Sequence, residues 1–404
     1  PFASLDQQWI FSKVQSVQPS ASNIPISLIM LLESRPEFSS RDDFLKRFRR
    51  ALWIQHAFGV SSVFIDTTGK CSVRKTGPVI IVGIFIALYL LIAWLVVAQN
   101  EVLCLYRANA HLLGLFFYFV IIETILALTC YKFNIFSTFW RPSQASLAQC
   151  WEMLFAKIVR FPVLYNRTVS TTLAFRIFWS WVIALSIMFS FILPTLVIRS
   201  RVKLMHDINH YMVFFMRMFG YLAQTTICAS FGLFAMLVRS VIRELQAFLH
   251  GGVVSTHQMR SIIQLYRHVC QMIDCFCAVY GWILLLMFFE HFIIITDRSF
   301  FAIRMYRLSA ELTITHVLRM MSTWIMPLVI NDFLLTGSCT AAEAALHEFE
   351  KHLCNYGKLY EDNEEVAFLV TSFTFYVAEP KPRFRILNAL NLNIALLYAV
   401  RASS

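Results

Sequence analysis

Three asparagines lie in the last apolar stretch of the chain, at Asn388, Asn391 and Asn393. The stretch of residues 380–400 begins with a basic collar and continues as an apolar run, which predicts a helix. An amide deep in an apolar membrane helix costs free energy unless it contacts water, an ion or another helix. Two interpretations are open: hydrogen bonding between helices, which is common in membrane bundles, or the lining of a water-filled path. Asn388 and Asn391 can share one helix face, so the second interpretation assigns these two to the path.

Other polar and aromatic side chains lie inside the remaining apolar segments. An ionisable group at membrane depth is by default a functional candidate that faces the bundle interior, and ligand pockets are mostly apolar with a few polar anchors. Two interpretations are again open: contact with a small organic ligand, or structural pairing, for example of Glu290 with Arg217 or Arg319. The candidates for ligand contact are Phe117, Tyr118, Ser190, Arg217, Tyr221, Glu290, His316 and Arg319.

No catalytic or metal-binding motif accompanies these residues. The sequence contains no HExxH, no serine elbow and no paired-carboxylate motif. Glu290 and His291 are adjacent, so a helix points them in different directions. The ten cysteines include no CxxC pair. The sequence therefore predicts neither an enzyme nor a cofactor or metal site.

The composition indicates a membrane protein. Hydrophobic residues make up 58% of the 404 residues and charged residues 15%, against about 25% charged residues in soluble domains. The apolar residues are gathered into long runs, so the lipid bilayer is the expected environment. The net charge of +11 does not indicate a nucleic-acid partner, because Lys and Arg lie between the apolar runs, as membrane topology predicts.

Seven apolar segments predict an all-α, polytopic membrane protein with seven transmembrane helices. Each of the first six is long enough to cross about 30 Å of hydrocarbon with some tilt. The last is short, so we expect a truncated seventh helix. The predicted spans are residues 77–98, 109–130, 172–198, 211–238, 273–296, 311–334 and 384–400.

The basic residues orient this bundle. The connections on alternate sides carry 24 Lys and Arg on one side and 7 on the other. The positive-inside rule therefore places residues 1–76 in the cytosol and the C-terminus outside, the opposite of a G-protein-coupled receptor. The sequon Asn166-Arg167-Thr168 then faces the cytosol and stays unmodified.

Two inner connections, residues 239–272 and 335–383, predict helices that extend beyond the membrane. Thr340 to Glu343 has the pattern of a capping box and predicts the start of a helix that ends near Gly357. These helices either pack together below the membrane or lie on the inner leaflet, and we expect the packed arrangement. The two apolar stripes are Met259, Ile262, Ile263, Tyr266 and Val269 in the first helix, and Ala342, Leu346, Phe349 and Leu353 in the second.

The layout of seven spans, long inner helices and a compact last helix resembles that of insect gustatory receptors. The residues that carry the resemblance are RALWIQHAFGVSSVF (50–64) and FLVTSFTFYVAEPKPRFRILNALNLNIALLYAV (368–400). The second is similar to that family's final inner helix, linker and start of span seven. The family ends span seven with Thr-Tyr, five apolar residues and Gln-Phe, whereas this chain reads LLYAVRASS, which indicates an incomplete pore helix.

The resemblance implies a ligand-gated, non-selective cation channel in the plasma membrane of sensory neurons. It implies a homotetramer in which span seven of each subunit surrounds the pore, and a small-molecule tastant that enters from outside among spans two to six. No cofactor is implied. The alternative function is a secondary transporter of small organic solutes, which would show internal repeats and matching broken helices; the sequence shows no repeat.

Overall fold

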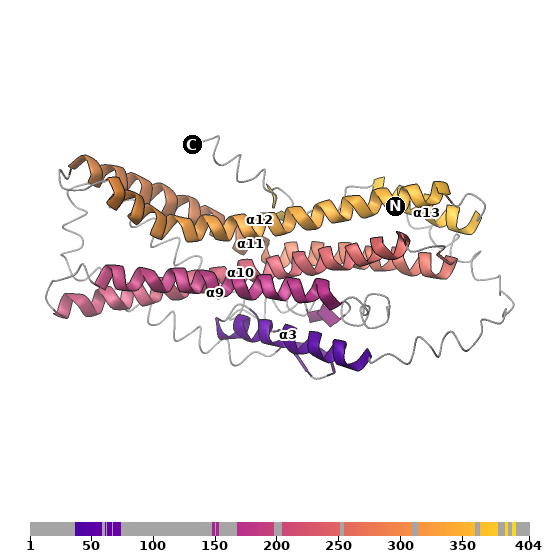
Figure 1. Cartoon of the computed structure of the whole chain (residues 1–404), viewed down its shortest axis with the longest axis horizontal. Coiled ribbons are helices and arrows are strands. Elements are labelled where there is room, and N and C mark those ends of the chain that lie inside the picture. Colours follow the sequence, from indigo (N-terminus) through magenta and orange to yellow (C-terminus); the bar gives the residue numbers. More distant parts are fainter. Residues whose placement is uncertain are drawn as a thin grey trace, which may run out of the picture. The chain divides into compact units, whose positions relative to one another are not determined.

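A computed structural model gives the structure of the chain (Figure 1). It forms two units, residues 1–40 and 41–404, and the description below concerns the second. The predicted spans 77–98 and 109–130 lie outside the described residues, and at several described helix positions, among them 204–220, 304–308 and 314–324, only the backbone is described. The structure describes residues 37–58, 61, 63–66, 68–73, 148–149, 151–152, 168–197, 204–250, 254–308, 314–359, 364–378, 384–386 and 390–392.

Three long helices dominate the second unit. They are α10 (Leu204–His250, 47 residues), α11 (Thr256–Leu308, 53 residues) and α12 (Ile314–Leu359, 46 residues). At about 1.5 Å per residue α10 and α12 are about 70 Å long and α11 about 80 Å, more than twice the hydrocarbon thickness of about 30 Å. Each helix therefore runs on past the predicted bounds of spans four to six.

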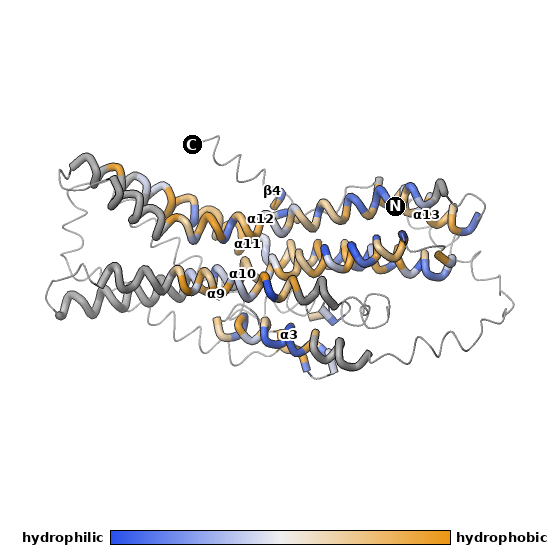
Figure 2. The backbone as a smooth tube through the Cα atoms, in the orientation of Figure 1, coloured by the Kyte–Doolittle hydropathy of each residue, from blue (hydrophilic) through white to orange (hydrophobic). Residues whose placement is uncertain are grey.

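Membrane-crossing character is found in the described part of these helices. Tyr221–His250 and Ile325–Tyr356 are long and apolar enough to cross a membrane, and Thr256–Gly281 with Ile283–Thr296 makes a third span if this bent pair counts as one. Figure 2 shows hydrophilic residues becoming frequent toward the ends of α11 and α12 that lie beside α13 (Glu364–Ala378). Those ends have the composition expected outside the hydrocarbon.

α10 lies at the centre of the described bundle. Its side chains from Gln224 to Val238 are all buried, because α12 and α9 (Thr168–Val197) both pack along it. A glycine of α10, Gly232, allows α9 to approach α10 closely. A Cβ atom at Gly232 would lie 2.5 Å from the Trp181 ring of α9 and 3.6 Å from Ser338 Oγ of α12.

The extension helices pack against one another. Every member of the two predicted apolar stripes is buried, and Tyr266 of α11 stacks on Phe349 of α12 and meets Phe373 of α13 edge-on. The predicted packed arrangement is therefore confirmed. The capping box is wrong: Thr340 lies inside α12 and its hydroxyl donates to the Thr336 carbonyl, because tertiary packing keeps the helix continuous to Leu359.

The N-terminal part of the second unit is a helix followed by a hairpin. α3 (Glu37–Ala57) precedes β1 (Val63–Ile65), which pairs antiparallel with β2 (Cys71–Val73). Gly69 in the turn between the two strands adopts a φ of 85°, which favours glycine. The Asp66 carboxylate closes this turn by accepting hydrogen bonds from two backbone N–H groups, those of Thr68 and Lys70.

A second hairpin stands where the seventh helix was predicted to begin. β3 (Arg385–Ile386) pairs antiparallel with β4 (Leu390–Asn391), so a helix starting at Phe384 is wrong; residues 393–400 lie outside the described ranges. Asn388 is a residue type that favours turns over helix interiors. Burial of Phe384 and Leu392, each fully buried, favours the hairpin over the helical pattern that the apolar residues suggest.

Candidate functional site

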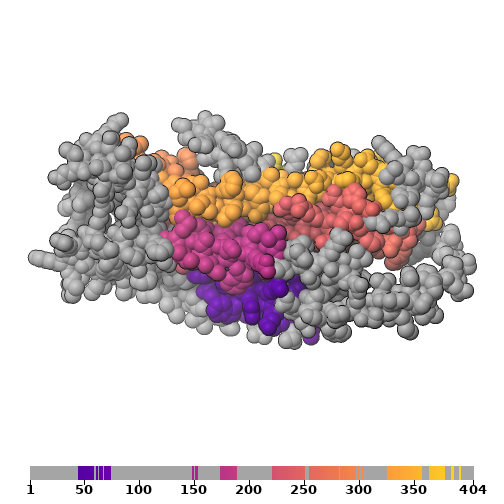
Figure 3. Space-filling model, viewed as in Figure 1, coloured from indigo at the N-terminus to yellow at the C-terminus, as the bar shows by residue number. Residues whose placement is uncertain are grey.

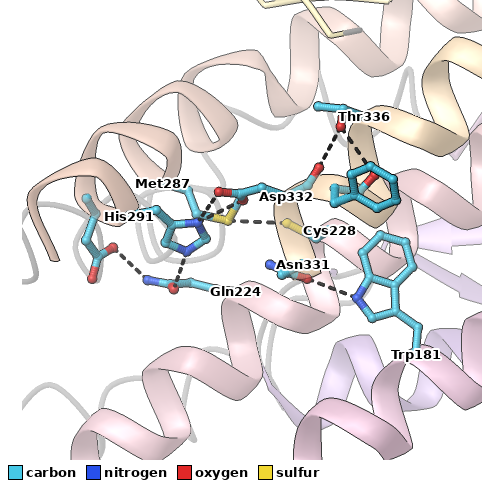
Figure 4. A network of polar contacts seen from close by, with 10 residues as sticks. Trp181, Gln224, Cys228, Met287, His291, Asn331, Asp332 and Thr336 are labelled. Carbon is cyan, nitrogen blue, oxygen red and sulfur yellow. Dashed lines mark hydrogen bonds and ion pairs between the residues drawn. The ribbon is translucent and has the colours of Figure 1, made fainter. Parts of the chain in front are cut away.

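A buried polar network joins α10, α11 and α12 (Figure 4). The side-chain amide of Gln224 donates to Glu290 Oε2 at 2.6 Å, and its oxygen lies 3.3 Å from His291 Nε2. His291 Nδ1 lies 2.8 Å and 3.0 Å from the two carboxylate oxygens of Asp332. All four residues are buried. A buried charge is tolerated only when it is paired and hydrogen-bonded, so these contacts stabilise one another.

His291 and Asp332 share two contacts at the ring nitrogen Nδ1, of 2.8 Å and 3.0 Å. The donor and acceptor roles of the two ring nitrogens follow the tautomer, and the role of Nε2 also follows the orientation of the Gln224 amide. An amide can be turned either way, so the network has two hydrogen-bond arrangements that differ in the orientation of Gln224.

Further buried contacts flank the network. The Trp181 indole N–H of α9 donates to Asn331 Oδ1 at 3.0 Å, beside Asp332 in the sequence. One helical turn beyond Gln224 on α10, the Cys228 thiol lies 3.4 Å from the Met287 sulfur. This hydrogen bond between Trp181 and Asn331 therefore joins α9 to α12, one of the three helices of the network.

A layer of aromatic side chains gives the depth of the network. Phe234 of α10 and Phe276 of α11 stack with their ring centroids 3.6 Å apart, and Trp151 meets both edge-on. Gln224 precedes Phe234 by ten residues, which is about 15 Å along a helix. The layer, called the aromatic layer below, comprises Phe48, Trp151, Phe175, Phe231, Phe234, Phe276 and Phe384.

The chain after α13 is fixed to this layer. The Phe384 ring lies 5.9 Å from Phe231 and 6.3 Å from Phe234 between centroids, and its backbone N–H donates to Glu343 Oε1 of α12 at 3.1 Å. The Leu392 N–H donates to the Phe384 carbonyl at 2.8 Å. The segment that leads to the predicted last span therefore starts from a point held by α10 and α12.

The structure brings two of the predicted site residues to this region. Glu290 belongs to the network, and Tyr221 is buried three residues before Gln224 on α10. Asn391 lies in β4, so the argument that it shares a helix face with Asn388 does not hold. Only the backbone is described at four other candidates, Ser190, Arg217, His316 and Arg319. Three more lie outside the described residues, namely Phe117, Tyr118 and Asn388.

Several network residues were absent from the sequence-based candidates. Gln224, Asn331 and Asp332 are polar residues within apolar runs, which is the signal that could have identified them. The predicted bounds also place Glu290 near the outer end of 273–296 and Asp332 near the inner end of 311–334. The His291–Asp332 contact puts the two at one level, so those bounds cannot both mark membrane edges.

Metal binding has no support in the described residues, where no group of three His, Cys, Asp or Glu side chains could hold an ion. The contacts of the network are hydrogen bonds and the His291–Asp332 pair. Each of these connects helices, so a relative movement of α10, α11 and α12 would have to break or rearrange the network.

Comparison with known proteins identifies relatives. A family model described as 7tm Chemosensory receptor matches residues 48–404. Among solved structures, the insect olfactory receptor OR5 from Machilis hrabei is similar, with a TM-score of 0.63 and 14% sequence identity over 90% of this chain and 97% of that one. At this identity the likeness shows the fold alone, and it confirms the predicted all-α, polytopic membrane fold. No curated protein sequence matches the chain.

Proposed function

The chain belongs to the 7tm chemosensory receptor family, and from this membership we propose that it is a ligand-gated, non-selective cation channel opened by a small-molecule tastant. The observation that carries the proposal is the extent of the family match, which runs from Phe48 to Ser404 and includes every predicted span. Proteins of this family are ligand-gated channels or receptors, not enzymes. The buried His291–Asp332 pair is accordingly a structural and switching element, not a catalytic one.

The proposal includes the assembly and its orientation. We place the N-terminus in the cytosol, because the basic residues favour that side, and the receptor in the plasma membrane of sensory neurons as a homotetramer. The aromatic layer then lies near the inner end of spans three, four and five. The polar network, about 15 Å farther along α10, lies close to the middle of a hydrocarbon core of about 30 Å.

The ligand site is proposed among spans two to six, next to the network. Tyr221 contributes an aromatic face one helical turn from Gln224, and Glu290 contributes the polar anchor. A ligand that takes a hydrogen bond from Gln224 or gives one to Glu290 would compete with a contact inside the network. The remaining residues proposed for this site are Phe117, Tyr118, Ser190, Arg217, His316 and Arg319, and those proposed for the pore are Asn388 and Asn391.

Opening requires that the ligand bind the open state more tightly than the closed state. The network offers a source of this difference, because its contacts join three helices and have two hydrogen-bond arrangements. The Phe384 contacts offer the connection to the pore, since the last segment starts from residues held by α10 and α12. A shift of α10 relative to α12 would therefore move the base of that segment.

Current recording from cells that express the chain tests the proposal. We expect cation currents on application of at least one compound from a panel of bitter compounds, sugars and carbon dioxide. Tyr221→Ala is expected to raise the half-maximal concentration of that compound by about tenfold, the loss of about 1.4 kcal/mol that one aromatic contact supplies. Phe292→Ala is the matched control, because Phe292 is an exposed aromatic side chain of α11 and should leave the concentration unchanged.

Two outcomes would contradict the proposal. One is a chain that reaches the cell surface yet neither conducts nor binds any member of the panel. The other is saturable uptake of a panel compound without a cation current, which would indicate the transporter instead.

A further inference from the structure

The outer face of α3 carries a stripe of basic residues with a tryptophan. Lys46, Arg49, Arg50 and Trp53 are all exposed, Trp53 with 68% of its surface accessible. At 100° per residue these four positions lie within about 100° of one another around the helix. They form a single stripe, here called the basic stripe, and in Figure 3 the side chains of α3, coloured indigo, form part of the visible surface beside those of α9.

Packing of the opposite face fixes the direction of the basic stripe. Leu45, Phe48 and Leu52 are buried on the inner side of α3. The Phe48 ring lies 4.4 Å from that of Trp151 between centroids, and Phe44 meets Phe175 of α9 edge-on at 5.6 Å. Rotation of α3 about its axis would expose these aromatic side chains, so the basic stripe faces outward.

The hairpin after α3 adds to the same surface. Arg49 Nη2 donates to the Asp66 carbonyl at 2.9 Å, which holds the β1–β2 turn against the helix. Lys70, at the end of that turn, is exposed as well. In the sequence 41–50 five basic residues stand against two acidic ones, so this part of the molecule is cationic.

The position of α3 along the bundle axis indicates which environment the basic stripe contacts. Its inner side chains join the aromatic layer, whose members Phe175, Phe234 and Phe276 lie within four residues of the predicted inner ends of spans three, four and five, at residues 172, 238 and 273. α3 also precedes the predicted first span, 77–98. A helix at this level presents its outer face to the boundary between hydrocarbon and water, where tryptophan is favoured.

We propose that the basic stripe of α3 binds the headgroups of anionic phospholipids in the cytosolic leaflet, with Trp53 inserted at the interface. The inference depends on the cytosolic orientation proposed above but not on the ligand or on channel activity. Each Lys or Arg near an anionic leaflet contributes about 1 kcal/mol, and the tryptophan ring is suited to the interfacial region. The bound lipid would hold α3 against the aromatic layer and, through it, against the base of spans three to five.

Fluorescence quenching by brominated lipids tests this inference. The purified full-length chain is placed in mixed micelles with brominated phosphatidylserine or brominated phosphatidylcholine, and the Trp53 contribution is taken as the difference from W53F. We expect half-maximal quenching of Trp53 at a concentration about a hundredfold lower for the anionic lipid, since three basic residues contribute about 3 kcal/mol together. In the triple variant K46Q/R49Q/R50Q the half-maximal concentrations of the two lipids are expected to become equal. Added salt is expected to have the same effect on the unsubstituted chain.

Matched variants distinguish the stripe from a general charge effect. R243Q/R260Q/K351Q removes three exposed charges from α10, α11 and α12 and should keep the preference, as should the charge-conserving K46R/R49K/R50K. The single variants K46Q and R50Q should each reduce the preference for the anionic lipid in part. They test the proposal even if the triple variant does not fold. Equal quenching by both lipids in the unsubstituted chain, or the same loss in the control triple, would overturn the proposal. Because no tastant or current enters this measurement, its failure is separate from failure of the channel proposal.

Discussion

At the scale of residues, Gln224 has the most restrictive role in the polar network. It supplies one donor and one acceptor from the same amide, to Glu290 and His291 respectively. An amide side chain offers both functions on one planar group. The network is therefore sensitive to chemistry at this position as well as to size.

Removing one partner of the buried His291–Asp332 contact tests how much the pair stabilises the chain. His291→Leu leaves the Asp332 side chain buried without its closest partner, and we expect it to lower the free energy of unfolding by about 3 kcal/mol. The double variant H291L/D332L removes both polar groups and is expected to be more stable than H291L alone. Unfolding of the purified chain in detergent, for all four members of the cycle, gives the coupling. Additive effects would contradict a stabilising contact between the two.

The sequence alone identified two residues of this site, Glu290 and Tyr221, but not their partners. Glu290 and Tyr221 stand out as an ionisable and an aromatic residue in apolar runs, but nothing in their spacing reveals a partner on another helix. His291 and Asp332 are separated by 41 residues. The side chains of Glu290 and His291 point in different directions, as expected for adjacent residues of a helix, yet the side-chain amide of Gln224 contacts both. Long-range register between helices is set by packing, which a single sequence does not display.

At the scale of elements, the crossing of α9 and α10 depends on a missing side chain. Trp181 lies over Gly232, and its indole N–H is held by Asn331 of α12. The ring is rigid and fixed at one edge, so it cannot move aside without losing a buried hydrogen bond. Three helices thus meet where only glycine leaves enough space.

Gly232→Ala is expected to destabilise the chain by about 1–3 kcal/mol through this overlap, despite the higher helix propensity of alanine. Gly337→Ala is the matched control, because no atom lies within 4 Å of the Cβ position there; it should be neutral or stabilising by up to about 1 kcal/mol. Thermal unfolding of both variants in detergent gives the comparison. Equal effects at the two glycines would show that the overlap with Trp181 is relieved at no cost.

The anchoring of the last segment can be tested at Phe384. This ring is fully buried in the aromatic layer, whereas Phe375 of α13 has 74% of its surface exposed. Phe384→Ala is expected to cost about 3–5 kcal/mol and to reduce ligand-evoked current at equal surface expression, and Phe375→Ala to change neither. Normal currents in the Phe384 variant would rule out this contact as the connection between the helices and the pore.

The contact between α3 and the first hairpin responds to pH. Burial lowers the pKa of His56 from 6.5 and outweighs the opposing effect of its hydrogen bond to the Val63 carbonyl. The unfolded segment therefore binds a proton at a higher pH than the folded one, so stability is lost as the pH falls below about 6.5. The hydrogen-exchange protection factors of residues 56–73, which are corrected for the intrinsic exchange rate at each pH, should fall from pH 7 to pH 5. H56N should remove this pH dependence and H257N, at an exposed histidine of α11, should retain it.

The elements were predicted unevenly from the sequence. The long helices and both apolar stripes follow from their periodicity. The capping pattern of Thr340 to Glu343 misled because Thr340 instead bonds back to Thr336 within a continuous helix. The β3–β4 hairpin was missed because Phe384 is fixed by distant side chains of α10 and α12, which local pattern does not include.

At the scale of the whole molecule, apolar side chains also lie on the outside of the helices. Leu173, Ile183 and Ile187 of α9 are exposed, as are Met326, Val329 and Phe333 of α12. Met326, Val329 and Phe333 lie on one face at helical spacing. Such faces are stable next to lipid or another subunit, which agrees with a membrane protein but does not say which end faces the cytosol.

The orientation can be decided by two independent measurements. The excess of basic residues places the N-terminus and Asn166 in the cytosol and the C-terminus outside. A tag at the N-terminus should therefore be detected only after permeabilisation, a tag at the C-terminus without it, and Asn166 should show no glycan on glycosidase treatment. Because Asn166 lies two residues before α9 begins at Thr168, a glycan there would place the start of α9 outside. That result would also move the aromatic layer and α3 to the outer face, and it would remove the cytosolic leaflet as the partner of the basic stripe.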